Sequence, residues 1–170
     1  GTVYRGVWGG TTDVAMKALK NEEDLGEFLR EAAMLKSIQH PNVVQYLGIY
    51  ESPDGARYLV TEYLALGSLS TLIRKEKDNL QAPELLLMAK HAAAGMAHLE
   101  KRSIVHRDLA LRNLLVTNKE GRFVVKVADF GLSRPMENNV YTSSDRRIPI
   151  KSAPPEYFEY GVTSTKSDVW

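Results

Sequence analysis

The sequence changes character once, near residues 64–70 (LALGSLS). Before this stretch, short apolar runs alternate with glycine-bearing turns, which is the pattern of β-hairpins. After it comes APELLLMAKHAAAGMAHLEKR, at residues 82–102, whose alanine and leucine content favours a long helix. A chain with strands first and a long helix afterwards folds into two packed parts, so we place a hinge between them at residues 64–70.

The first part contains two predicted hairpins and one helix. Residues 2–8 and 13–19 flank the turn sequence GGTT, and residues 43–50 and 57–63 flank SPDG, so each pair of runs predicts two antiparallel strands. Between the hairpins, residues 23–38 carry apolar side chains at helical spacing until a His-Pro pair interrupts the pattern. This spacing predicts an amphipathic helix.

The second part begins with the long helix. Pro83 stands at a position suited to a first helical turn, and Lys101 and Arg102 stand at the negative end of the helix dipole. Its apolar content predicts that the helix is largely buried. Residues 114–116 and 123–128 then flank the polar turn sequence TNKEGR, and they predict a pair of short strands.

Composition narrows the classes of function. The 170 residues carry 22 basic and 21 acidic side chains, so no global charge favours a nucleic acid partner or an anionic membrane. The chain has no cysteine, which excludes disulfides, thiolate catalysis and cysteine-bound zinc. The most apolar stretch, residues 85–97, contains a lysine, a histidine and a glycine, so we expect no membrane contact.

Two polar motifs lie at the ends of the predicted strands after the long helix. HRDLALRN occupies residues 106–113, and DFG occupies residues 129–131. Matches of this kind, in this order, should arise by chance in fewer than about one in ten thousand chains of this length. Together with VAMK at residues 14–17 and Glu31 in the first helix, they show that the whole chain resembles a protein kinase catalytic domain.

These residue types suit phosphoryl transfer, in which charge must be positioned and neutralised. Lys17 can contact the nucleotide phosphates, and Glu31 can hold that lysine in place. Asn113 and Asp129 offer the oxygen ligands that Mg²⁺ or Mn²⁺ prefers. Asp108 can accept the proton of the acceptor hydroxyl. Taken alone, each has an ordinary structural explanation, such as an exposed lysine or a turn acid.

The resemblance implies an α+β fold with two lobes. Residues 1–63 would form a partial N-lobe with an antiparallel sheet and one helix, and residues 64–170 the hinge and a partial, mainly helical C-lobe. Of the glycine-rich motif G-x-G-x-x-G-x-V only the last glycine, Gly1, is present, and TSTKSDVW resembles the start of the central helix of the large lobe. We therefore expect a truncated domain that lacks the first strand and the C-terminal helices.

The resemblance also implies an adenine site. TEYL, at residues 61–64, matches the family's hinge, whose main chain binds the base. Thr61 would be the small gatekeeper residue, and Glu62 and Leu64 would supply main-chain groups. The residues expected around the nucleotide are Gly1, Val3, Ala15 and Leu115. The side chains that match the stack linking the two lobes are Leu35, Tyr46, His106 and Phe130.

Other motif residues resemble supporting or regulatory positions. Asp168 matches the acid that fixes the main chain of HRD, and Glu156 matches an acid that pairs with an arginine beyond residue 170. Gly131 completes the DFG motif. A phosphate on Tyr141, in the segment after that motif, would be bound by Arg107 and Arg134.

The acceptor is expected to be tyrosine. Ala110 and Arg112 match the tyrosine kinase signature D-L-A-x-R-N, and Pro149 in IPIKSAPPE matches the substrate platform. The resemblance thus implies a cytoplasmic protein tyrosine kinase that uses ATP with Mg²⁺ or Mn²⁺ and acts on tyrosine-bearing proteins. Ser152 and Pro154 depart from the family pattern, which has tryptophan and alanine there.

Two alternatives remain open from the residues. A pseudokinase scaffold would bind nucleotide or partners without transfer, and the departures at Ser152 and Pro154 motivate this possibility. A serine/threonine or dual-specificity kinase is the other, and Ala110 argues against it because serine/threonine kinases usually carry a lysine at that position.

Overall fold

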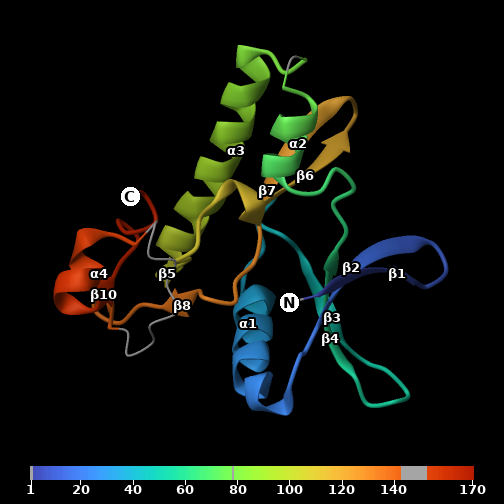
Figure 1. Cartoon of the computed structure of the whole chain (residues 1–170), viewed down its shortest axis with the longest axis horizontal. Coiled ribbons are helices and arrows are strands. Elements are labelled where there is room, and N and C mark those ends of the chain that lie inside the picture. The colour runs from blue at the N-terminus through green and yellow to red at the C-terminus, as the bar shows by residue number, and fades with distance from the viewer. Residues whose placement is uncertain (1, 78, 143–152) are drawn as a thin grey trace.

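A computed structural model describes residues 2–77, 79–142 and 153–170 (Figure 1). Strands β1 (Val3–Trp8), β2 (Thr12–Ala18), β3 (Tyr46–Glu51) and β4 (Arg57–Glu62) form one antiparallel sheet in the order β1-β2-β4-β3. Both predicted hairpins are confirmed, because β1 pairs with β2 and β3 pairs with β4.

The predicted start of the third strand is wrong. β3 begins at Tyr46 and not at Val43, because the preceding residues bond to a strand elsewhere in the chain. The N–H of Val44 donates to the carbonyl of Val127 at 2.9 Å, and Val43 forms a parallel bridge with the same residue. This segment therefore ties the four-stranded sheet to the second part of the molecule.

The predicted first helix is confirmed as α1 (Leu25–Ser37), which follows a 3₁₀ turn, η1 (Glu22–Asp24). Its inner face buries Phe28, Ala32 and Leu35 together with one charged residue, Glu31. The helix ends where Ile38 adopts an extended backbone. α1 stands beside the sheet and contacts β3 (Figure 1).

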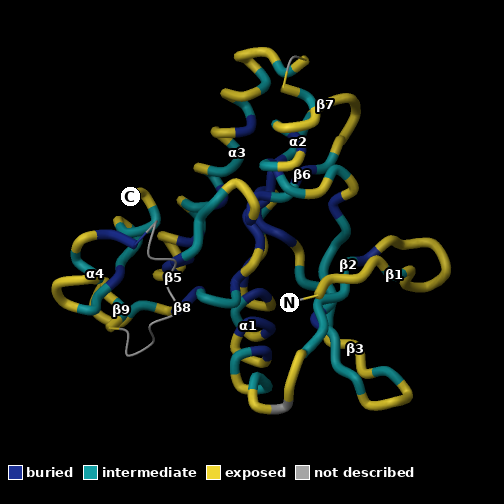
Figure 2. Tube along the Cα trace, in the orientation of Figure 1, coloured by how far each residue is buried: buried dark blue, intermediate teal, exposed yellow. Residues whose placement is uncertain are grey.

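The second part begins with α2 (Leu69–Lys75) and the long helix α3 (Ala82–Lys101). The main-chain N–H of Gln81 donates to Glu84 at 2.9 Å, which caps the start of α3. The expectation of a largely buried helix is wrong. Its buried residues are Met88, Gly95 and Leu99, which share one face, while exposed positions follow much of its length (Figure 2). The covered face of α3 lies against β5 and β7.

Short strands follow α3. The predicted pair is confirmed as the hairpin of β6 (Leu114–Lys119) and β7 (Arg122–Val127). The remaining elements are β5 (Ile104–Val105), η2 (Leu111–Asn113), β8 (Arg134–Pro135), β9 (Tyr141–Thr142), α4 (Pro155–Tyr160) and β10 (Val162–Thr163). β5 pairs with β8, and β9 pairs with β10. In the part of the chain that the structure describes, no helix is long and apolar enough to cross a membrane.

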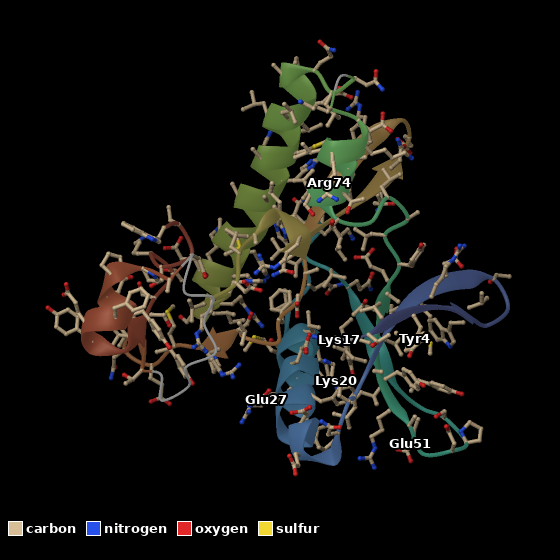
Figure 3. All side chains as sticks on the ribbon, viewed as in Figure 1. Tyr4, Lys17, Lys20, Glu27, Glu51 and Arg74 are labelled. Atoms are coloured by element: carbon tan, nitrogen blue, oxygen red, sulfur yellow. The ribbon has the colours of Figure 1, made fainter. Side chains whose placement is uncertain are left out.

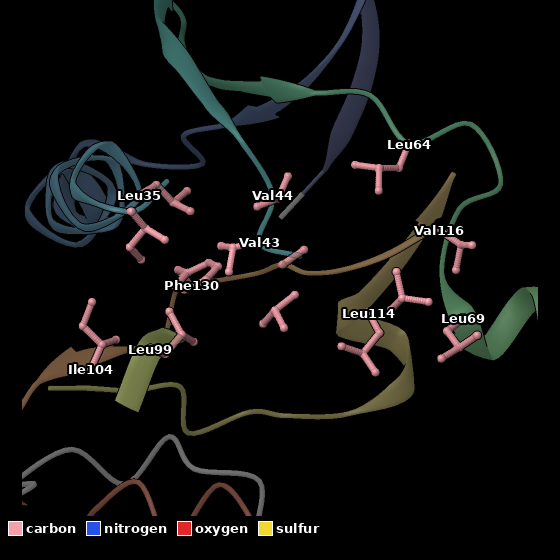
Figure 4. Packing of buried hydrophobic residues seen from close by; sticks show 14 of the residues in the cluster. Leu35, Val43, Val44, Leu64, Leu69, Leu99, Ile104, Leu114, Val116 and Phe130 are labelled. Carbon is pink, nitrogen blue, oxygen red and sulfur yellow. The ribbon is translucent and has the colours of Figure 1, made fainter. Parts of the chain in front are cut away.

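One hydrophobic core joins the two parts (Figure 4). It contains Leu35 from α1, Leu59 from β4, Leu99 from α3 and Phe130 from the segment after β7, all nearly inaccessible to solvent. Gly95 lets α3 approach closely, because a Cβ there would lie 2.5 Å from the carbonyl oxygen of Asn42. That carbonyl accepts the N–H of Val127 at 2.9 Å. The junction fixes β7 and therefore the motif that follows it.

Candidate active site

Three charged side chains from three separate elements meet between the sheet and α1. Lys17 Nζ, on β2, lies 2.8 and 2.9 Å from the two carboxylate oxygens of Glu31, on α1. The same ammonium lies 3.1 Å from Oδ1 of Asp129, after β7. The side chain of Glu31 is 9% exposed and that of Asp129 is 50% exposed. Lys17 thus bridges a buried acid and a half-exposed one. Figure 3 marks Lys17 between α1 and the sheet.

The electrostatics keep this cluster charged. Burial alone would lower the pKa of Lys17, but the charges of Glu31 and Asp129 raise that pKa above its ordinary value. Burial would likewise raise the pKa of Asp129, and the charge and hydrogen bond of Lys17 reverse this and lower the pKa. At neutral pH the site therefore presents an ammonium and an ionised carboxylate.

A second cluster lies within one loop. Asp108 accepts two bonds from Nδ2 of Asn113, at 2.7 Å to Oδ2 and 2.8 Å to its carbonyl oxygen. The guanidinium of Arg112 pairs with Oδ1 of the same aspartate. Because Nδ2 is engaged in this way, Asn113 keeps its amide oxygen as an acceptor. The Asp108 side chain is only 14% exposed.

The side chain of Asp168 holds the loop that carries Asp108. Asp168 accepts the main-chain N–H groups of His106 and Arg107 at 2.8 and 2.7 Å. These bonds lower its pKa, but the larger effect of burial raises it above the ordinary value. His106 is fully buried, bonds through Nε2 to the carbonyl of Ala128 at 3.0 Å and packs edge-on against Phe130 at 5.3 Å.

A cavity of about 220 Å³ opens between the two clusters. The predicted residues that line it are Val3, Ala15, Lys17, Glu31, Leu35, Thr61, Arg112, Asn113, Leu115 and Asp129. Val44, Leu59 and Ala128 also line it, although their sequence context indicates only ordinary strand residues. A larger cavity, of about 640 Å³, lies between α1 and the end of α3, and of the predicted site residues only Arg134 lines it.

The hinge holds a contact that the sequence did not indicate. Glu62, at the end of β4, pairs with the buried Lys126 of β7 at 2.5 Å. Its main-chain N–H donates to the carbonyl of Gln45 at 3.0 Å. Leu64 is buried and its carbonyl accepts the N–H of Gly67 at 3.1 Å. The side chains of Glu62 and Leu64 therefore do not line the cavity, and only their main chain could serve a ligand.

Two of the predicted regulatory residues, Arg107 and Tyr141, are in contact. The guanidinium carbon of Arg107 lies 4.9 Å from the ring centre of Tyr141. Tyr141 belongs to β9 and pairs with Thr163 of β10. Arg134 donates to the carbonyls of Gly131 and Ser133 at 3.2 and 2.8 Å.

Comparisons with known proteins place this site in a family. A sequence model described as protein tyrosine and serine/threonine kinase matches residues 1–170. The chain belongs to this protein kinase family. The resemblance seen in the motifs is therefore confirmed, as is the α+β fold class. Members of the family use ATP with a divalent metal ion and phosphorylate proteins.

Relatives of the kinase domain are similar along its whole length. The chain is 46% identical to human tyrosine-protein kinase ABL2, 44% identical to tyrosine-protein kinase Abl of Drosophila melanogaster and 41% identical to human tyrosine-protein kinase Fer. Each alignment covers 100% of this chain but only 14%, 10% and 21% of the respective relative. The chain thus corresponds to a small part of each of these proteins.

The structure does not test every predicted position of the kinase domain. Gly1 and Pro149 lie outside the described residues, as does Ser152. Glu156, in α4, accepts a bond from the hydroxyl of Ser167 at 2.7 Å. Gly131 lies close to the charged cluster. A Cβ atom added to Gly131 would lie 3.7 Å from Lys17 Nζ.

Proposed function

We propose that this kinase domain transfers the γ-phosphoryl group of ATP to tyrosine hydroxyls of proteins. The observation that carries the proposal is the convergence of Lys17, Asn113 and Asp129 on one cavity, with Asp108 bonded to Asn113 beside it. The relatives above are all named tyrosine-protein kinases, which supports the choice of acceptor.

The nucleotide base would lie in the apolar half of the cavity. Ala15 of β2 and Leu115 of β6 line it from opposite parts of the molecule, and Val3 would cover the base. The main chain of Glu62 and Leu64 would bind the adenine edge, with Thr61 at the back. This arrangement supports a division into an N-lobe at residues 1–63 and a hinge with the C-lobe at residues 64–170.

The polar half of the cavity suits the triphosphate and a metal ion. Lys17 would contact the phosphates and Glu31 would keep the ammonium in place. The amide oxygen of Asn113 and the half-exposed carboxylate of Asp129 are hard oxygen donors of the kind that Mg²⁺ or Mn²⁺ takes. A bound metal ion would neutralise charge on the phosphate oxygens.

Asp108 would take the hydroxyl proton of the acceptor. Its contacts with Asn113 and Arg112 keep the carboxylate at the edge of the cavity. Arg112 lines the cavity and can supply charge near the transferred group. The small Ala110 would leave room for a phenol ring. Pro149 would support that ring.

Other residues would hold the catalytic loop in place and regulate its activity. His106, Phe130 and Asp168 would fix the loop and the DFG motif through the contacts described above. Phosphate on Tyr141 would bind Arg107, which already lies against its ring, and Arg134, and so order the segment. We also propose that the domain acts in the cytoplasm, as a soluble kinase or as the intracellular domain of a receptor.

The test is phosphate transfer from Mg-ATP by the full-length protein to matched peptides that differ only in a tyrosine, serine or threonine acceptor. Phosphotyrosine should form, and Asp108→Asn should abolish most of it. Phosphoserine or phosphothreonine as the main product would contradict the acceptor. Nucleotide binding with no transfer to any peptide would support a pseudokinase scaffold instead.

A further inference from the structure

A buried lysine forms an ion pair with a hinge residue. Lys126, on β7, is 6% exposed, and its ammonium lies 2.5 Å from Oε1 of Glu62. A buried ammonium is costly unless an acid compensates its charge. Lys126 stands three positions before Asp129, on the strand that leads to the DFG motif. The ion pair therefore joins the strand of the proposed metal ligand to the segment proposed to bind adenine.

Glu62 is held at several points. The carboxylate oxygen that pairs with Lys126 also accepts the main-chain N–H of Gln45 at 2.8 Å. The N–H of Glu62 donates in return to the carbonyl of Gln45 at 3.0 Å. The side chain and the main chain of Glu62 are thus fixed together, so a displaced carboxylate would carry the hinge backbone with it.

Hydrogen bonds hold the part of β7 that carries Lys126. Val127, next to Lys126, donates its N–H to the carbonyl of Asn42 at 2.9 Å, and Asn42 donates its side-chain amide to the carbonyl of Val125 at 3.0 Å. Val125 and Val127 are fully buried. Lys126 therefore extends from a strand that is fixed on both sides, and its length sets the distance to the hinge.

We propose that Lys126 is a positioning residue for nucleotide binding. By holding Glu62, its ammonium sets the spacing between the hinge main chain, which binds the base, and Asp129 and Asn113, which serve the phosphates. This role rests on the proposed function. The ion pair touches neither Lys17 nor Asp108, so its loss should weaken ATP binding while the transfer step itself stays intact.

The same region supplies a matched control. A cavity of about 330 Å³ behind the hinge is lined by both Lys126 and Lys119. Lys119 is an exposed residue at the end of β6. Replacing either lysine by methionine removes one ammonium from the same cavity, but only Lys126→Met removes the contact with Glu62.

The experiment compares wild type, Lys126→Met, Glu62→Gln, the double variant and Lys119→Met in the full-length protein. Steady-state kinetics give KM for ATP and kcat, a fluorescent ATP analogue gives Kd without turnover, and thermal melting reports folding. Lys126→Met should raise KM and Kd about tenfold, which is within the usual range of coupling between contacting residues, with kcat changed less than about twofold. The double variant should match the more affected single variant, and Lys119→Met should match wild type.

Other outcomes would overturn the role. Unchanged KM and Kd in Lys126→Met, with only a lower Tm, would make the ion pair merely structural. Effects of the two single changes that multiply in the double variant would show that the residues act independently. If Lys126→Met does not fold, Glu62→Gln decides by the same criteria. A wild-type protein that transfers no phosphate would overturn the proposed function instead, and the Kd values would still decide the role of Lys126.

Discussion

The two charged clusters of the site differ in how the chain builds them. Lys17 and Asp129 are 112 positions apart, and they meet with Glu31 only because β2, α1 and the end of β7 pack together. Asp108, Arg112 and Asn113 lie within six consecutive residues and contact one another inside one loop. One cluster thus depends on tertiary structure, and the other on local backbone geometry.

Because of this difference, a movement of α1 could change nucleotide positioning without changing the groups that carry out the transfer step. A shift of α1 relative to the sheet would break the contact of Glu31 with Lys17 without moving Asp108. The loop cluster is instead held by Asp168, which accepts the N–H groups of His106 and Arg107. We therefore expect that changes in the loop cluster affect the transfer step, and that changes in the assembled cluster affect nucleotide positioning as well.

The largest expected effect is that of Asp108→Asn. Loss of the proton acceptor should reduce kcat about a thousandfold, within the usual range for general base catalysis. KM for ATP should stay within about twofold of wild type, because the assembled cluster is untouched. Steady-state kinetics with a tyrosine peptide check both values. Equal activity of the variant would remove Asp108 from the mechanism.

Lys17→Met should come next. Without its ammonium the phosphates lose their cation, and Glu31 is left as a buried acid without its partner. We expect kcat/KM to fall about a hundredfold, with both kcat and KM affected, as is usual for a misplaced reacting group. Kinetics over a range of ATP concentrations give kcat and KM separately. A decrease in kcat alone would show that Lys17, like the loop cluster, acts only in the transfer step.

A smaller loss is expected for Glu31→Gln. Lys17 would retain the contact with Asp129 but lose its most buried partner, so kcat/KM should fall about tenfold. Glu27→Gln is the matched control, because Glu27 lies one turn earlier on α1 and faces Arg30 at 3.8 Å. Equal activity of the two variants would show that the position of Lys17 does not depend on α1.

Gly95→Ala should weaken the fold that assembles the first cluster. The added Cβ would lie 2.5 Å from the main-chain oxygen of Asn42, and overpacking of this kind costs roughly 1–3 kcal/mol. Gly26→Ala is the control, since no atom lies within 4 Å of its Cβ position in α1 and it should stabilise by roughly 0.5–1 kcal/mol. Chemical denaturation gives both values, and a stable Gly95→Ala protein would contradict the close packing.

The smallest effect concerns pH. Burial, His98 and Lys101 lower the pKa of His40, which stacks on His98 at 4.8 Å at the junction between α1 and α3. Because the folded state binds this proton less readily than the unfolded state, stability should decline as the pH falls below about 6.5. His40→Gln should reduce this decline, as measured by the denaturation midpoint. An unchanged decline would assign it to other groups.

Local patterns predicted the six longer strands and the two longest helices, but not α2, α4 or the two-residue strands. Long-range contacts account for the errors within the predicted elements. The turns GGTT, SPDG and TNKEGR and the spacing in residues 23–38 were sufficient for three hairpins and one helix. Residues 43–45 read as part of a strand, yet they bond to β7 and to the hinge. The burial of α3 was overestimated because apolar content alone does not show how many faces are covered.

The candidate site shows the same division. Asp108 and Asn113 could be read from one motif, whereas the meeting of Lys17, Glu31 and Asp129 followed only from resemblance to a family. Lys126 was missed because a lysine in VVKVADF reads as a solvated strand residue, and nothing local points to Glu62, which is 64 positions away. A contact between residues so far apart in the sequence forms only when the chain folds, so no local pattern predicts it.

The most direct test of the account is a crystal structure of the protein with Mg²⁺ and a non-hydrolysable ATP analogue. The account predicts adenine at the main chain of Glu62 and Leu64, phosphates at Lys17, and a metal ion about 2.1 Å from oxygens of Asn113 and Asp129. A nucleotide bound elsewhere, or bound here with the metal ion away from both residues, would contradict it.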